Sequence, residues 1–240
     1  MKSVSMKSLD AISNRDFVAE FLFASSLIAV HISHFAEDII LFSNPAFNYF
    51  QIGQAYSTGS RLMPQKRNPD SLELARGKTG RIISALINLL IVLKGLPSTY
   101  NKDIQEDKEY LFDSVDNLTL ILSVVAGVID SLEIFPEKML SHLEETILVT
   151  DIADFLVDHG VPFREAHNRV GEVIRYSEEK NIPLSEVPLE ALTKIAPQFE
   201  QDYQYIFDFR KSINAKGSVG GTATEALSSQ IKLAKERLTT

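Results

Sequence analysis

The sequence contains no cysteine and no tryptophan among its 240 residues. Without cysteine the chain forms no disulfide bond and has no thiolate to act as a nucleophile or metal ligand. Its formal net charge is -8, so lysine and arginine are not in excess for binding the phosphates of nucleic acid. We therefore expect no nucleic-acid partner. A small anionic substrate is compatible with this charge, because a few cations can cluster locally on an acidic protein.

Long hydrophobic runs are also scarce. The first ten residues, MKSVSMKSLD, lack the apolar segment of a secretory signal. The longest apolar run, residues 82–93, is interrupted by Ser84 and Asn88 and is shorter than the ~20 residues of a membrane span. We expect no membrane insertion and a cytoplasmic location. A helix that is apolar on nearly every face must be surrounded by other helices, in a bundle or an oligomer.

Strand signals are almost absent, and apolar residues follow helical spacing over long stretches instead. This spacing predicts three long helices: one of about 29 residues that starts after Ser13 and ends before Asn44, and two over residues 69–94 and 107–132. Beyond Pro136 the predicted helices become shorter and proline more frequent. We therefore expect an all-α chain, with a helical bundle in residues 1–136 and a small helical domain in residues 137–240.

Local signals mark the ends of the first two helices. Ser13 with Asp16 three residues later predicts a capping box, and Asn68 is a candidate cap for the second helix. Gly77 and Gly80 lie inside the second helix, where each glycine costs up to about 1 kcal/mol relative to alanine. Close approach of a neighbouring helix would offset that cost, so we expect one there.

The segment STGSRLMPQKRNPD, residues 57–70, is polar and cationic where it precedes the second helix. Arg61, Lys66 and Arg67, together with the positive end of the helix dipole, predict a site for an anion. Ser60, next to Gly59, is a candidate nucleophile or base. A solvated loop between helices is the alternative interpretation.

Two further polar groups are less specific. Residues 97–110, PSTYNKDIQEDKEY, mix side-chain donors with acids between the second and third helices. Taken as a charge run alone, this segment favours a solvated turn over a binding site. His31, His34 and Asp38 share one helix face at a spacing that suits a metal ion. We favour an ordinary polar stripe there, and no metal site.

Several spaced motifs together resemble the argininosuccinate lyase family of the fumarase/aspartase superfamily. The superfamily signature, roughly G-S-S-x-M-P-x-K-x-N-P, matches Gly59, Ser60, Met63, Pro64, Lys66, Asn68 and Pro69. Within the superfamily, four further segments resemble argininosuccinate lyases: SNRDFVAEFL at 13–22, LKGLPSTYNKDIQEDKE at 93–109, VPFREAH at 161–167 and GGTA at 220–223. The resemblance implies a long-helix bundle of the fumarase/aspartase type.

The resemblance also implies a reaction, the β-elimination of argininosuccinate to arginine and fumarate without metal or organic cofactor. Ser60 matches the catalytic serine, which is the expected base, and Lys66 is expected to stabilise the developing negative charge. Glu73 matches an acid that pairs with a catalytic histidine. The matching substrate-binding positions are Asn68, Tyr100, Gln105 and Lys108.

Family members form homotetramers whose active sites combine motifs from three subunits, so we expect a homo-oligomer. This chain has Arg61 where the family usually has serine, and none of its five histidines matches the context of the family's catalytic histidine. We therefore expect no turnover by this chain alone and restoration by a complementing N-terminal half. Adenylosuccinate lyase or fumarase activity, or a non-catalytic structural role, are the alternatives.

Overall fold

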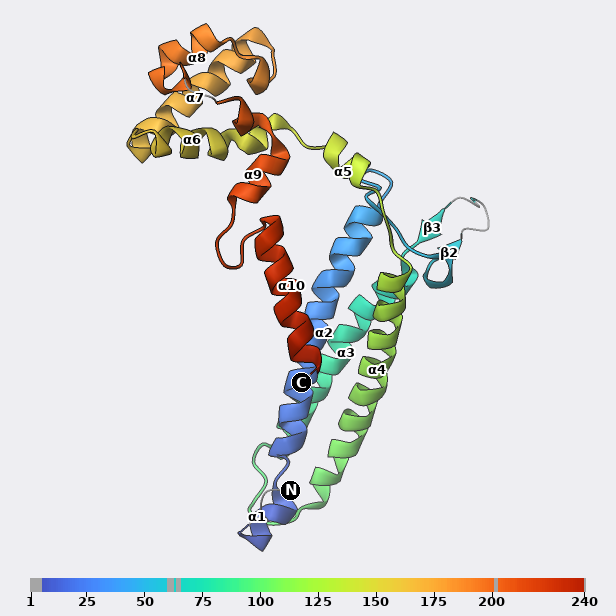
Figure 1. Ribbon diagram of the computed structural model, residues 1–240. Helices are drawn as coiled ribbons and strands as arrows, with labels where there is room; N and C mark the ends of the chain where they lie inside the picture. The colour runs from blue at the N-terminus through green and yellow to red at the C-terminus, as the bar shows by residue number, and fades with distance from the viewer. Residues whose placement is uncertain (1–5, 60–62, 64–65, 201–202, 240) are drawn as a thin grey trace. The chain divides into compact units, whose positions relative to one another are not determined.

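The computed structural model describes residues 6–59, 63, 66–200 and 203–239 (Figure 1). Helices supply nearly all the regular structure, which confirms the all-α prediction. Contacts divide the chain into two compact units, Met1–Ser141 and His142–Thr240. The expected boundary at residue 136 falls at the start of α5, which belongs to the first unit.

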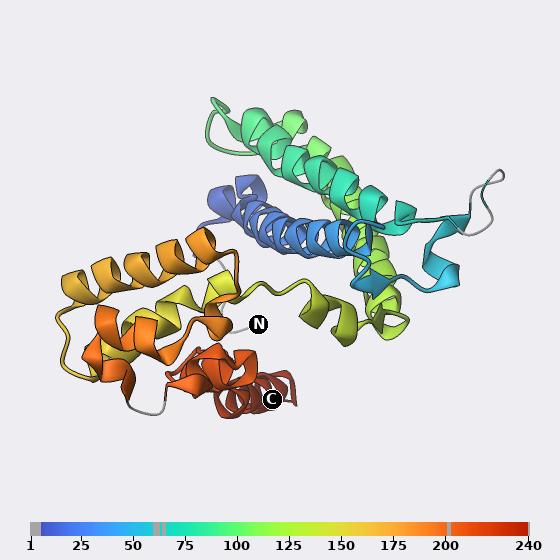
Figure 2. The ribbon, with the colours of Figure 1, turned by 90° about the horizontal axis from the view of Figure 1, so that it is seen from above.

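Three long helices form the first unit, and consecutive helices run in opposite directions (Figures 1 and 2). Helix α2 packs against both α3 and α4, and α3 packs against α4. The elements of this unit are α1 Ser8–Ser13, α2 Asp16–Ser43, β1 Phe50–Gln51, η1 Gln54–Tyr56, β2 Thr58–Gly59, β3 Arg67–Asn68, α3 Asp70–Leu93, η2 Lys102–Glu106, α4 Asp107–Asp130, β4 Glu133–Ile134 and α5 Pro136–Ser141.

The core of the bundle is built from residues spaced three and four apart on each helix, as an apolar helix face requires. One cluster joins Ala29, Leu72 and Ile121 with their neighbours, and another joins Leu22 to Leu89. Burying each such leucine or isoleucine stabilises the fold by roughly 1.5–3 kcal/mol. The three predicted long helices therefore exist because their apolar faces meet.

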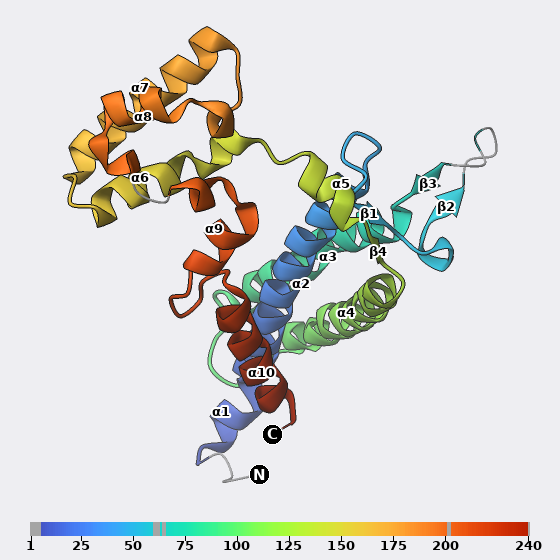
Figure 3. The same ribbon diagram turned by 45° about the horizontal axis from the view of Figure 1, so that its top comes forward.

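Two short strand pairs fix the segments at the ends of these helices. β1 pairs with β4, with Phe50 opposite Ile134, which ties the chain after α2 to the chain after α4 (Figure 3). β2 pairs with β3, with Thr58 opposite Asn68. Each pair is two residues long in each strand, so neither forms a separate layer.

Both predicted caps are wrong. The Ser13 hydroxyl donates to the carbonyl oxygens of Leu9 and Asp10, at the end of α1, rather than capping α2. Asn68 lies in β3, and α3 begins after Pro69 without a side-chain cap. Strand pairing holds the Asn68 backbone in β3, outside the helix start, and a local hydrogen bond engages the Ser13 hydroxyl at the end of α1.

The expected close approach at Gly77 and Gly80 is also not found within the part of the chain that the structure describes. A Cβ atom at either position would meet no atom within 4 Å. Both glycines are on the exposed surface of α3. The helix-propensity cost is therefore not offset by contacts with the residues that the structure describes.

Large apolar side chains remain exposed on all three long helices. Phe17 on α2 is 66% exposed, Leu74 on α3 65% and Phe112 on α4 60%. Residues 16–43 and 102–130 are long and apolar enough to cross a membrane, with mean hydropathies of 1.5 and 1.6 over 18-residue windows. Helices at the centre of a soluble assembly have the same length and hydropathy, so these two properties alone do not identify a membrane span. Exposed apolar faces of this kind are typical of surfaces that contact other protein.

The second unit contains shorter helices around a separate core. Ile152, Phe155, Val173, Leu192 and Phe199 are among its buried residues. No residue of α10 is buried. The elements are η3 Glu145–Leu148, α6 Val149–Asp158, α7 Phe163–Lys180, η4 Leu184–Glu186, α8 Leu189–Ile195, η5 Pro197–Glu200, η6 Gln204–Phe207, α9 Phe209–Ala215 and α10 Thr224–Thr239.

Candidate active site

The cationic segment predicted from the sequence joins η1 to α3. Residues 57–59 and 66–69 form its base, held together by the pairing of β2 with β3. The Thr58 hydroxyl hydrogen-bonds the Asp70 carboxylate, and the Ser71 hydroxyl donates to the Tyr56 carbonyl oxygen at 2.6 Å. Ser60 and Arg61 lie outside the described residues. The base of the segment is therefore fixed to the first turn of α3.

Three of the predicted site residues surround one hollow at this end of the bundle. Lys66, Asn68 and Glu73 line a cavity of about 640 Å³, together with Ile40 and Phe50 from the chain around the end of α2. Lys66 and Glu73 are exposed, and Asn68 is half-buried. The cavity is large enough for a small-molecule substrate.

The electrostatics of the hollow favour an anion. Arg67 and Lys66 contribute two cations to its wall, against one carboxylate from Glu73. Helix α3 is 24 residues long and begins at this point, so the positive end of its dipole lies beside the hollow. The Arg67 guanidinium donates to the Ile52 carbonyl oxygen at 3.4 Å. That contact ties the Arg67 side chain to the chain just before η1.

The other predicted site residues form a linked chain of hydrogen bonds after α3. The Lys108 ammonium donates to the Gln105 side-chain oxygen at 2.8 Å, and the Gln105 amide donates to the Tyr100 hydroxyl at 3.1 Å. All three side chains are wholly or partly exposed. Together they present hydroxyl, amide and ammonium groups, which can all donate to a carboxylate ligand.

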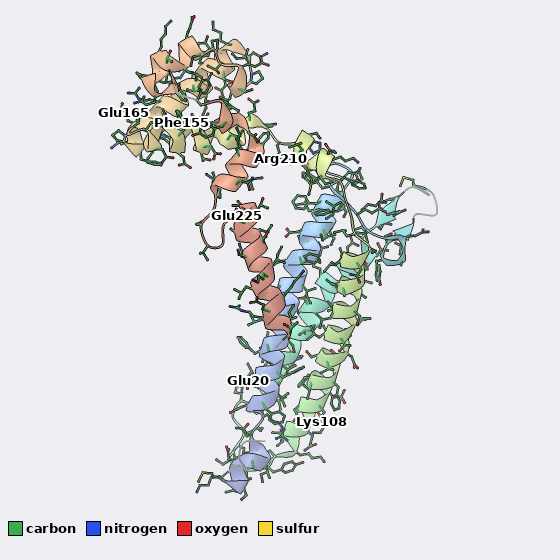
Figure 4. The ribbon with its side chains drawn as sticks, in the orientation of Figure 1. Glu20, Lys108, Phe155, Glu165, Arg210 and Glu225 are labelled. Carbon is green, nitrogen blue, oxygen red and sulfur yellow. The ribbon has the colours of Figure 1, made fainter. Side chains whose placement is uncertain are left out.

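Within one chain the two groups of residues lie at opposite ends of the bundle. Glu73 is in the first turn of α3, whereas Lys108 is in the first turn of α4, at the far end of the bundle (Figure 4). The 24 residues of α3 separate the groups by about 36 Å at 1.5 Å per residue. One chain therefore does not bring Lys66 and Lys108 to the same small molecule.

Arg15 and Asp107 were not selected from the sequence, yet they form a largely buried ion pair beside Lys108. Arg15 lies in the segment 13–22 and Asp107 in the segment 93–109, both quoted above for the family resemblance, but neither residue was assigned a role. Their contact joins residues 92 apart in the sequence, so no local signal marked it.

His31, His34 and Asp38 are exposed on α2. Across the described ranges, no three His, Asp or Glu side chains are close enough together to hold a metal ion.

Two family models match the sequence. One, described as "Lyase", matches residues 1–84, and the other, "Argininosuccinate lyase C-terminal", matches residues 146–214. The last part of α3, residues 85–93, and the 97–108 segment lie between the two matches.

Curated relatives extend the similarity over nearly the whole chain. The argininosuccinate lyase of Roseiflexus sp. (strain RS-1) is 49% identical over 98% of this chain and 52% of its own length. That of Schizosaccharomyces pombe (strain 972) is 43% identical over 96% of this chain and 50% of its own length. The chain thus spans about half the length of the curated relatives it matches.

Solved structures show the same fold. An EDDS lyase variant with bound fumarate has a TM-score of 0.84 and 24% identity, covering 99% of this chain and 49% of its own. A class II fumarase from Schistosoma mansoni has a TM-score of 0.61 and 15% identity, covering 83% of this chain and 42% of its own. These likenesses confirm the predicted bundle fold. The sequence matches alone, from the two family models and the curated relatives, show that the chain corresponds to the C-terminal half of argininosuccinate lyases.

Proposed function

We propose that this chain supplies the C-terminal half of an argininosuccinate lyase, a carbon–nitrogen lyase of arginine biosynthesis. The observation that carries the proposal is the convergence of Lys66, Asn68 and Glu73 on one hollow at the start of α3. Identity of 49% to a relative with that name supports it. The fumarate named with the EDDS lyase variant supports a dicarboxylate product.

In the proposed reaction, Ser60 acts as the base and removes a proton from the carbon beside a substrate carboxylate. The electron pair delocalises into that carboxylate and then breaks the bond between carbon and guanidinium nitrogen. An acid of the assembled enzyme gives a proton to the departing nitrogen, so the group leaves as the guanidinium of arginine, and fumarate remains. Lys66 and Asn68 stabilise the carboxylate while it carries additional negative charge, which is where fixed cations and donors accelerate a reaction most.

The remaining residues have binding and orienting roles in this proposal. Glu73 orients the catalytic histidine, which another part of the enzyme supplies. Tyr100, Gln105 and Lys108 bind the substrate. No metal and no organic cofactor takes part.

The proposal requires more than one chain. The two groups of site residues are about 36 Å apart in one chain, so copies of the chain must combine their opposite ends. We propose a homotetramer in the cytoplasm, assembled through the exposed apolar faces of α2, α3 and α4. A complementing N-terminal half supplies the histidine.

The test is complementation. The chain is mixed with the N-terminal half of the Roseiflexus relative, and fumarate formation from argininosuccinate is followed by its ultraviolet absorbance. We expect no turnover by either half alone and turnover by the mixture. Lys66→Ala should lower kcat/KM by roughly 10²–10³-fold, as loss of a charge-stabilising group does. Lys138→Ala, which removes an exposed lysine of the same unit that faces the Phe135 ring, is the matched control and should retain activity.

Three results would contradict the proposal. Turnover by this chain alone within about tenfold of the mixture would show that the second half is not needed. A mixture that splits adenylosuccinate or hydrates fumarate instead would indicate another lyase of the superfamily. A folded, assembled mixture that converts none of these substrates would indicate a non-catalytic structural role.

A further inference from the structure

A buried ion pair lies directly behind the exposed residues Tyr100, Gln105 and Lys108. The Arg15 guanidinium contacts the Asp107 carboxylate, and the two side chains are only 13% and 8% exposed. In comparison, the Arg81 side chain of the pair Arg81–Asp113 is 63% exposed. A buried pair of this kind fixes geometry strongly, because either charge left alone would be poorly solvated.

The Asp107 carboxylate connects this pair to the exposed residues. One of its oxygens contacts Arg15, and the other, Oδ1, accepts a hydrogen bond from the Lys108 ammonium at 3.0 Å. Lys108 in turn donates to Gln105, and Gln105 donates to Tyr100. An unbroken series of contacts therefore runs from Arg15 to all three exposed side chains.

The backbone gives Arg15 a fixed position from which to act. Its carbonyl oxygen accepts hydrogen bonds from the Val18 and Ala19 amides, which anchors it at the start of α2. Asp107 is the first residue of α4 and follows η2, whose Ile104 is 1% exposed. The ion pair therefore ties the start of α2 to the junction of η2 and α4.

The segment before η2 needs such a tie. Thr99 has a φ of 90°, which is unfavourable for a β-branched residue. The Asn101 side chain donates to the carbonyl oxygens of Pro97 and Thr99, both at 3.2 Å, and so holds this turn locally. A strained turn followed by exposed side chains keeps one geometry only if its far end is fixed.

We propose that Arg15 is a positioning residue, which acts through Asp107 to hold the Lys108 ammonium and the Gln105 amide in place for substrate. Without the guanidinium, the buried Asp107 carboxylate has Lys108 as its nearest cation and draws that ammonium inward. Lys108 then leaves Gln105 and is less available to a bound anion. This inference rests on the proposed function, because it takes Lys108 and Gln105 as substrate ligands.

One experiment tests whether the Arg15–Asp107 ion pair holds this segment in place, and it needs no enzymatic reaction. Amide hydrogen exchange is measured over residues 101–110 in Arg15→Ala, Arg15→Lys and the control Arg81→Ala, which removes an exposed pair to α4. We expect exchange in this segment to become about tenfold faster in Arg15→Ala, because local opening becomes easier. Arg15→Lys should lie between that variant and wild type, and Arg81→Ala should match wild type there. Unchanged exchange in Arg15→Ala would overturn the proposal, and Arg15→Lys decides it if Arg15→Ala does not fold.

A second experiment tests the effect on substrate in the complemented enzyme. Arg15→Ala should raise the KM for argininosuccinate by roughly 10- to 100-fold, the scale for loss of one hydrogen bond to a charged group, while kcat falls less than about threefold. Arg15→Lys should recover at least half of that loss on a logarithmic scale, and Arg81→Ala should have the wild-type KM. If Arg15→Ala instead lowered kcat by that 10- to 100-fold factor and left KM unchanged, the positioning role would be refuted. If the wild-type mixture itself lacks turnover, the proposed function fails. The exchange measurement still shows whether the Arg15–Asp107 ion pair holds residues 101–110 in place.

Discussion

Replacing Gly127 by alanine has two opposing effects on stability, a gain in helix propensity and a clash with Tyr56. Gly127 lies on α4, where alanine is normally about 1 kcal/mol more favourable than glycine. A methyl group at this position would lie 1.9 Å from the Tyr56 hydroxyl oxygen and 2.2 Å from the ring carbon that carries it. Tyr56 must therefore move, and its carbonyl oxygen is also the acceptor for the Ser71 hydroxyl.

The clash should outweigh the gain in helix propensity. Overpacking a filled site costs roughly 1–3 kcal/mol, so Gly127→Ala is expected to destabilise the first unit by about 1 kcal/mol net. Gly77→Ala and Gly80→Ala have the same chemistry without the clash and should stabilise by about 0.5–1 kcal/mol. The difference between the two classes of variant is then about 2 kcal/mol, or roughly 4–8 °C in Tm for a chain of this size.

Urea unfolding followed by far-ultraviolet circular dichroism measures this difference, at a concentration where light scattering shows one state of assembly for all three variants. Comparison within the first unit avoids assuming that both units unfold together. A Gly127→Ala chain as stable as Gly80→Ala would refute the packing of Tyr56 against α4. Destabilisation by Gly80→Ala would instead show that α3 is covered at that point by another chain.

Two further predictions concern one exposed ion pair and the second core. The hydrogen bond from Arg81 lowers the pKa of Asp113, so the stability it contributes is complete above the ordinary aspartate pKa of about 3.9 and is lost as the pH falls through the lower folded value. Both side chains are substantially exposed, so Asp113→Asn should lower the free energy of unfolding by less than about 1 kcal/mol at pH 7. When unfolding midpoints are measured at successively lower pH, the difference between the variant and wild type should shrink. A cost that does not shrink as the pH falls below the ordinary aspartate pKa would contradict this assignment. Phe155 is 3% exposed in the second core, and Phe155→Ala should destabilise that unit by about 3–5 kcal/mol, while hydrogen exchange in α3 stays unchanged. Equal loss of protection in both units would show that they unfold as one.

The long helices were predictable because their signals are local. Apolar spacing, acids in the first turn of α3 and Gly95 after its end all lie within the segment they describe, and α3 spans Asp70–Leu93 where residues 69–94 were expected. Their length also fixes the separation of the two groups of site residues. The position of Lys66, Asn68 and Glu73 near one helix start could likewise be predicted from the sequence.

The helix caps failed because several side chains competed for each role. Ser13 and Asn14 are both suitable caps, and the Asn14 side chain accepts the Asp16 amide at 2.8 Å while Ser13 bonds backward to α1. Asn68 lies in β3 and pairs with Thr58 of β2, ten residues earlier in the chain. A local pattern shows which side chains can cap a helix, but packing selects among them.

By itself, the sequence determined the helical class, the three long bundle helices and the polar segments that carry the candidate site, because each depends on residues close together in the chain. Only the tertiary structure decided that the hollow at the start of α3 also takes its wall from the end of α2, and that Arg15 reaches Asp107 across 92 residues. Such contacts depend on which helix faces meet, and no local spacing encodes the distance between side chains on different helices.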